Sequence, residues 1–186
     1  MHNDKLDILV LIRESSDPRP PASVTTRGAA ISDRGLRRVP NPADLAALEE
    51  ALHLKDNLGA QVTVLAIGPR RLDDTLRLAF SMGADRGIRF WDHGVEGGDS
   101  VADARILARI VKILLPDLVF TGSRMADRGD DPVPALAAAA AGVPPGRRSD
   151  AGRLQPDGGR AGSRVRVAPP QQAGRALRGG PGHAQP

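Results

Sequence analysis

Short apolar runs that alternate with amphipathic segments constrain the fold of this chain most strongly. Residues 8–12 form a continuous run of branched apolar side chains, and residues 62–67 form a second, mostly apolar run. Runs of this kind are typical of strands that are buried on both faces of a parallel sheet. Residues 87–91 and 118–121 predict a third and a fourth strand of the same sheet.

The segment between the first two predicted strands contains an excursion and a helix. Residues 13–40 are rich in polar, Pro and Gly residues, and we expect a small hairpin within residues 24–39. Asn41 is a favourable N-cap residue and Pro42 suits the first turn of a helix. Gly59 is suited to end that helix.

Three more helices are predicted further along the chain. They cover residue 72 to near residue 83, residues 100–114, and residues 135–141. Ser100 and Asp103 have the spacing of a capping box at the start of the second of these. Strands separated by helices imply right-handed crossovers, so we predict an α/β fold with a doubly wound, mostly parallel, Rossmann-like sheet.

Ligands of doubly wound sheets bind beyond the carboxyl ends of the strands, where the strand order reverses. The candidate site loops are therefore residues 12–16, 67–71 and 121–134. The last loop combines glycines with a helix start, which suits a phosphate, although neither a Gly-x-Gly-x-x-Gly nor a Walker pattern is present. Its three aspartates oppose an anion unless Arg124 and Arg128, or a cation, offset them. From spacing alone, a solvated loop is the alternative.

Composition excludes several classes of protein. The chain has no cysteine, so disulfides, thiol nucleophiles and thiolate metal sites are excluded, and its four histidines lack metal-ligand spacing. One Trp, three Phe and no Tyr argue against a base-stacking surface for nucleic acid. We expect neither a catalytic site nor a bound metal. The apolar run at residues 8–12 is too short for membrane insertion, so a cytoplasmic protein is expected.

The last 42 residues differ in composition from the rest of the chain. Residues 145–186 contain 8 Arg, 9 Gly, 6 Pro and 6 Ala, with 2 Asp and no Lys or Glu, whereas residues 1–144 carry 18 basic and 20 acidic residues. The excess positive charge therefore lies in this tail and does not indicate a nucleic-acid surface. The tail is predicted to be disordered. Two interpretations remain open: a natural tail, or a reading-frame shift near residues 143–144.

Four segments together resemble the beta subunit of an electron transfer flavoprotein. They are NPADLAALEEALHLKD at residues 41–56, VTVLAIGP at 62–69, SMGADRGIRF at 81–90 and PDLVFTG at 116–122. The resemblance covers residues 7 to 144 and implies a domain over residues 1–144 with an adenine nucleotide alpha hydrolase-like fold.

The resemblance also implies a function. In that family the beta subunit forms a heterodimer with an alpha subunit that holds the redox-active FAD. The pair carries electrons from dehydrogenases, such as those that act on acyl-CoA in fatty acid oxidation, to a membrane quinone oxidoreductase. The beta subunit is an electron-carrier subunit without its own catalytic site. Many members bind a structural AMP, and a bifurcating branch binds a second FAD in the same pocket.

Carried over by position, the resemblance implies a cofactor pocket built from the ends of two strands, the start of the first helix and the loop after the fourth strand. These residues are Leu11, Asn41, Pro42, Ala43, Asp44, Ile67, Gly122, Ser123, Arg124, Met125, Ala126, Asp127, Arg128, Gly129, Asp130, Asp131, Pro132 and Val133.

This chain departs from the family at the end of that loop. Family members commonly have Gln followed by Thr or Val where Pro132 and Val133 stand here. Pro132 removes an amide donor and the Gln side chain. Asp130 and Asp131 add negative charge near the expected phosphate, so both changes are expected to weaken AMP binding. Two alternatives remain: a stand-alone adenine-nucleotide-binding module of the universal-stress-protein type, or a truncated product without function.

Overall fold

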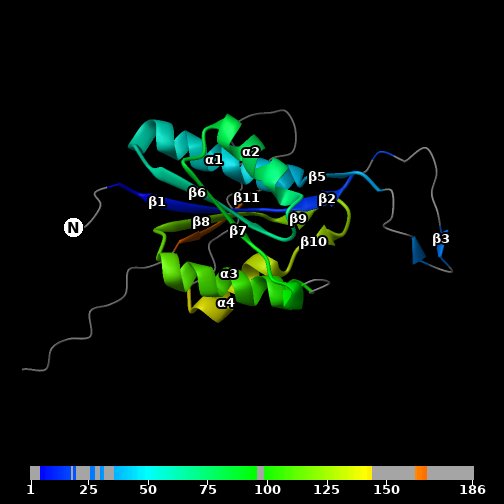
Figure 1. The fold of residues 1–186 in the computed structure, drawn as a ribbon. Coiled ribbons are helices and arrows are strands. Elements are labelled where there is room, and N and C mark those ends of the chain that lie inside the picture. Colours follow the sequence, from blue (N-terminus) through cyan, green and yellow to red (C-terminus); the bar gives the residue numbers. More distant parts are fainter. Residues whose placement is uncertain are drawn as a thin grey trace, which may run out of the picture.

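The computed structural model describes residues 5–17, 19, 26–27, 30–31, 36–95, 99–143 and 162–166. A five-stranded sheet with strand order β11-β8-β1-β6-β7 forms the middle layer of the molecule (Figure 1). Its strands are β1 (Asp7–Ile12), β6 (Gln61–Ile67), β7 (Arg86–Phe90), β8 (Leu118–Gly122) and β11 (Gly162–Arg166). Strand β1 pairs in parallel with β6 and β8, and β6 pairs in parallel with β7. The predicted doubly wound, mostly parallel sheet is confirmed.

Helices cover both faces of this sheet. Helices α1 (Pro42–Leu58) and α2 (Leu72–Met82) lie on one face, and α3 (Ser100–Leu114) and α4 (Val133–Ala141) lie on the other (Figure 1). A short 3₁₀ helix, η1 (His93–Val95), follows β7. Because α1 and α2 lie on one face and α3 on the opposite face, the strand order reverses between β1 and β8. The predicted ligand position is therefore at the carboxyl ends of these two strands.

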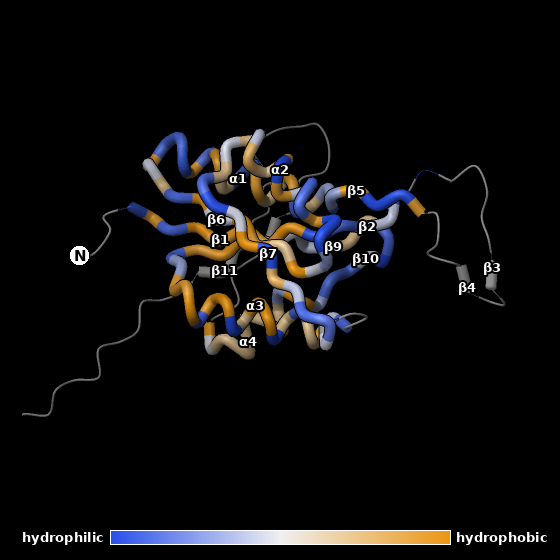
Figure 2. Tube along the Cα trace, viewed as in Figure 1, coloured by the Kyte–Doolittle hydropathy of each residue, from blue (hydrophilic) through white to orange (hydrophobic). Residues whose placement is uncertain are grey.

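The side chains of β1 alternate between two core clusters, one on each face of the sheet. Ile8, Val10 and Ile12 pack into the cluster beneath α1 and α2, whereas Leu9 and Leu11 pack into the cluster with α3 and α4. All five side chains are at most 1% exposed. Figure 2 shows the same pattern, with apolar residues concentrated along the central strands. Burial on both faces explains why the strand has no polar residue after Asp7.

The end of α1 agrees with the sequence prediction, whereas the start of α3 differs from it. Gly59 ends α1 with a left-handed φ of 67°, as predicted. Helix α3 is capped by Asp99, whose carboxylate accepts hydrogen bonds from the backbone N–H groups of Val101 and Ala102. The capping box predicted from Ser100 is therefore wrong, because the preceding residue is an equally good cap and Ser100 is already helical.

Three short strand pairs lie in the segments that follow β1 and β8 along the chain. The bounds are β2 (Glu14–Ser16) with β5 (Arg38–Pro40), β3 (Thr26–Arg27) with β4 (Ala30–Ile31), and β9 (Arg124–Met125) with β10 (Gly129–Asp130). All three pairs are antiparallel. The pair β3–β4 is the small hairpin that the sequence predicts within residues 24–39.

Strand β11 corrects one expectation for the tail. It pairs antiparallel with β8, with Gly162 opposite Gly122 and Arg166 opposite Leu118, in a region where no regular element was predicted. The open edge of β8 presents unpaired backbone groups, and a segment can satisfy them without an alternating side-chain pattern. The other residues of the tail lie outside the described residues, so the domain boundary at residue 144 and the tail's disorder or frame shift stay predictions.

Candidate functional site

A pocket of about 380 Å³ opens beside the carboxyl end of β8 and the start of α1. The hairpin β9–β10 forms its other wall. Seven residues line it: Asn41, Pro42, Ala43, Arg124, Met125, Ala126 and Gly129. The pocket therefore lies at the reversal of the strand order, where the topology predicts a ligand.

A buried ion pair joins the end of β1 to the start of α1. Arg13 binds Asp44 through one edge of its guanidinium, at 2.8 Å from Nη2 to Oδ1 and 3.0 Å from Nε to Oδ2. The Asp44 carboxylate also accepts the backbone N–H groups of Arg13 at 3.0 Å and Gly122 at 2.8 Å. The side chain of Asp44 is fully buried. This one carboxylate therefore holds β1, β8 and α1 together behind the pocket.

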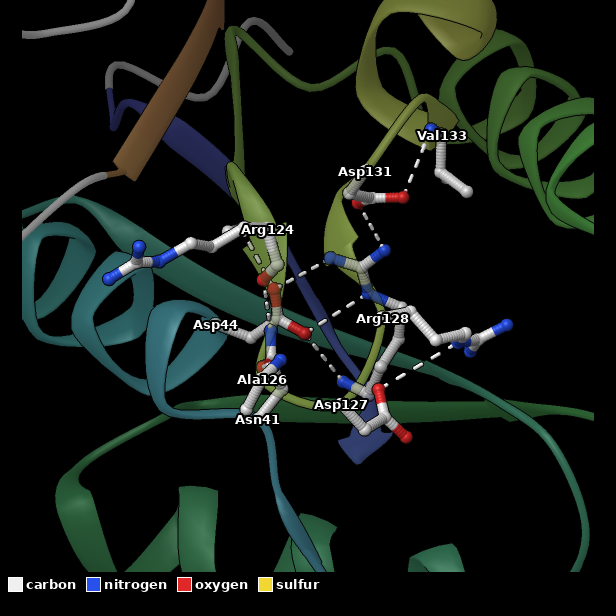
Figure 3. A network of polar contacts seen from close by, with 10 residues as sticks. Asn41, Asp44, Arg124, Ala126, Asp127, Arg128, Asp131 and Val133 are labelled. Carbon is white, nitrogen blue, oxygen red and sulfur yellow. Dashed lines mark hydrogen bonds and ion pairs between the residues drawn. The ribbon is translucent and has the colours of Figure 1, made fainter. Parts of the chain in front are cut away.

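The same guanidinium holds the end of the pocket loop. Arg13 Nη1 lies 2.5 Å from Asp131 Oδ2, and the other oxygen of Asp131 accepts the backbone N–H of Val133 at 3.1 Å (Figure 3). Burial alone would lower the pKa of Arg13, but the charges and hydrogen bonds of Asp44 and Asp131 outweigh it and raise that pKa. Arg13 therefore stays charged and offsets both carboxylates.

Asn41 connects α1 to the hairpin that walls the pocket. Its Nδ2 donates to the backbone carbonyl of Arg124 at 2.9 Å, and its Oδ1 accepts the N–H of Ala126 at 3.1 Å (Figure 3). Asn41 is at the N-cap position, as predicted, but its side chain makes no capping hydrogen bond. The prediction of its position is confirmed, and the capping role is wrong because the amide binds the loop instead.

Asp103 on α3 lies close to this charged network. Burial raises the pKa of its carboxyl group, the positive charges of Arg13 and Arg128 act to lower it, and the negative charges of Asp131 and Asp99 raise it further. The folded protein therefore binds a proton at Asp103 more readily than the unfolded chain does.

Replacing Asp103 by Asn should change the pH dependence of stability. The unfolded aspartate has a pKa of about 3.9. Between that pH and the higher folded pKa, the folded wild-type protein binds more protons, so its stability falls as pH rises. Asp103→Asn should be more stable than wild type at neutral pH, and the difference should shrink on acidification. Urea titrations from pH 4 to pH 8 test this, with the exposed Asp56→Asn as control; parallel pH curves for all three proteins would contradict it.

The structure brings most of the carried-over residues together. Residues 41–44 and 122–133 meet at the pocket or in the polar network behind it. Leu11 and Ile67 do not line the pocket: Leu11 is fully buried in the core, and Ile67 packs against the same cluster. The loop at residues 67–71 contributes no lining residue either.

The charge compensation agrees with the expectation for Arg128 and adds a second cation, Arg13, that was not named. Arg128 lies 3.7 Å from Asp127, and the cation that neutralises Asp131 is Arg13. Arg13 is not among the predicted site residues, although it directly follows a buried strand and lies in a predicted site loop. Asp127 accepts the backbone N–H of Ser16 at 2.9 Å and so joins the loop to β2.

Two absences apply to the part of the chain that the structure describes. Within it, no group of His, Asp or Glu side chains could hold a metal ion. None of its helices has the length and apolar character needed to cross a membrane.

Known proteins match this chain over much of its length. The electron transfer flavoprotein domain matches residues 29–175. The chain is 31% identical over 125 residues to the electron transfer flavoprotein subunit beta of Methylophilus methylotrophus, which covers 66% of this chain and 47% of that protein. It is 33% identical over 140 residues to the same subunit of Syntrophomonas wolfei, covering 75% and 54%. It is also 40% identical over 102 residues to protein FixA of Rhizobium meliloti, covering 52% and 35%.

These matches differ in extent. The domain match continues past residue 144, where the sequence resemblance was expected to stop. The chain spans from 35% to 54% of the length of these three relatives. The domain match includes more than half of the chain, and the relatives from Methylophilus methylotrophus and Syntrophomonas wolfei are both subunit beta. The chain therefore belongs to the electron transfer flavoprotein beta-subunit family.

Proposed function

We propose that this chain acts as the beta subunit of an electron transfer flavoprotein and that its pocket binds AMP as a structural ligand. The observation that carries the nucleotide assignment is the pocket itself. It lies at the reversal of the strand order, and none of its seven lining residues is a carboxylate. The negative charge expected to repel a phosphate is absent from the lining, because Asp131 is turned toward Arg13.

The size of the pocket supports a mononucleotide over a second FAD. Small-molecule sites occupy about 300–1,000 Å³, and this pocket, at about 380 Å³, lies at the lower end of that range. Pro132, which stands where family members commonly have Gln, lies outside the lining residues.

The partners follow from the family and belong to the same proposal. The chain would pair with an alpha subunit that holds the redox-active FAD, and the heterodimer would pass electrons from dehydrogenases to a quinone oxidoreductase. The beta subunit would contribute structure rather than a catalytic site of its own. Co-expression with an alpha subunit should yield a yellow complex, whereas the beta chain alone should be colourless. A colourless mixture that separates on size-exclusion chromatography would contradict this pairing.

Isothermal titration of the purified chain with AMP tests the pocket. We expect one AMP per chain. Ala126→Leu places extra volume on the pocket wall and should weaken binding about tenfold or more, because an overpacked contact costs about 1–3 kcal/mol.

Ala139→Leu is the matched control, because Ala139 is exposed on α4 and lies outside the lining residues. Equal losses in the two variants, or no binding by wild type, would overturn the pocket assignment.

A further inference from the structure

We infer that Arg124 determines ligand specificity in this pocket by selecting a phosphomonoester over an uncharged nucleoside. The inference rests on the proposed function of the pocket as a nucleotide site. It names the residue and the interaction by which the pocket would distinguish the two ligands, which the fold and the position of the pocket do not specify.

The first argument is charge. Arg124 is the one charged residue among the seven that line the pocket. Its side chain is exposed, and in the described part of the chain no carboxylate is found paired with it. Figure 3 shows the Arg124 side chain extending away from Asp44 and Asp131. A cation in this position has its hydrogen-bond donors available for a ligand.

The second argument is that the backbone of Arg124 is fixed while its side chain is not. Asn41 binds the Arg124 carbonyl, and the antiparallel pairing of β9 with β10 holds the same residue from the other side. The point from which the guanidinium extends is therefore set by the fold. A planar guanidinium donates paired hydrogen bonds to phosphate oxygens, and such charge-assisted bonds are among the strongest available to a side chain.

The third argument is the polarity of the adjoining helix. Ala43 lines the pocket and is the first residue of α1 with a backbone N–H, since Pro42 has none. The amide of Asn41 binds the hairpin and leaves this helix end without a side-chain cap. The one acidic residue of the first turn, Asp44, is neutralised by Arg13. The positive end of the helix and Arg124 therefore act on the same space, and both favour an anion.

Asp130 carries a negative charge opposite Arg124 in the register of the β9–β10 strand pair, yet its side chain is exposed and does not line the pocket. A competing ion pair between these two exposed side chains would contribute little. A bound phosphate can therefore displace it.

The experiment compares AMP with adenosine on wild type, Arg124→Gln and Arg109→Gln by isothermal titration. Wild type should bind AMP about tenfold or more tightly than adenosine, because one charge-assisted contact corresponds to about that factor. Arg124→Gln should lose about tenfold in AMP affinity, keep its adenosine affinity within about twofold, and show a weaker salt dependence for AMP. Arg109 is exposed on α3 outside the pocket, so Arg109→Gln should match wild type.

Three results would overturn the inference. Equal affinity of wild type for AMP and adenosine would remove the role of the phosphate but leave the pocket assignment intact. Equal losses for both ligands in Arg124→Gln would make Arg124 a structural residue. If wild type bound neither ligand, the proposed function itself would fail. Arg124→Lys provides a further check: it keeps the charge but not the planar fork, so its AMP affinity should lie between those of wild type and Arg124→Gln.

Discussion

Asp44→Ala should lower the free energy of unfolding by about 3–5 kcal/mol, the range typical of removing one partner of a buried ion pair. The Arg13 side chain is 9% exposed and would keep its charge without its bidentate partner. Two backbone N–H groups, those of Arg13 and Gly122, would lose their acceptor at the same time. The loss would therefore combine a buried charge that keeps Asp131 as its remaining partner with unsatisfied backbone donors.

Urea denaturation of the full chain measures this effect, with the transition midpoint and slope recorded for each variant. Asp56→Ala is the matched control, because Asp56 is an exposed aspartate near the end of the same helix. Its replacement should change stability by less than about 0.5 kcal/mol. Similar midpoints for Asp44→Ala and Asp56→Ala would mean that the ion pair does not hold the strands to α1.

Asp44→Asn separates the two contributions. Asn keeps one carbonyl oxygen that can accept a backbone N–H, but it loses the negative charge opposite Arg13. We expect a loss smaller than that of Asp44→Ala, yet still well above that of the Asp56 control. An unchanged midpoint for Asp44→Asn would assign the stabilisation to hydrogen bonding rather than to charge.

The layers of the fold could be predicted because they depend on local patterns. The apolar run in β1 predicts burial on both faces, and the structure divides it between two clusters, as a strand between two helix layers requires. The end of α1 at Gly59 also follows from one residue. The start of α3 was harder, because Asp99 and Ser100 are both good caps and the local sequence does not choose between them.

The polar network could not be predicted for a different reason. Arg13 and Asp131 are 118 positions apart, and Asn41 binds residues 83 and 85 positions away. No local pattern relates such residues, so the rule for helix caps assigned Asn41 a role that a distant loop overrides. Strand β11 shows the same limit, since backbone pairing on an open edge needs no side-chain pattern.

Gly122→Ala should destabilise the protein by about 2–4 kcal/mol through steric conflict and a lost hydrogen bond. A Cβ atom at this position would overlap Asp44 Oδ1 and lie 2.9 Å from both the carbonyl carbon and the Cβ of Ala43. Backbone atoms cannot move aside as a flexible side chain can, and Asp44 is held by Arg13. The first turn of α1 must therefore shift away from β8, which should weaken AMP binding as well, because Ala43 lines the pocket.

Gly94→Ala is the control for this substitution. Gly94 is exposed, and the nearest atom to its added Cβ would be Asp92 Oδ1 at 3.1 Å, on an exposed side chain that can rotate. Neither Gly94 nor Gly122 has a positive φ, so the two variants differ in packing and not in backbone strain. We expect Gly94→Ala to stay within about 0.5 kcal/mol of wild type. Equal urea midpoints for the two variants would show that α1 and β8 are not in close contact at Gly122, and the wall of the pocket would then need another explanation.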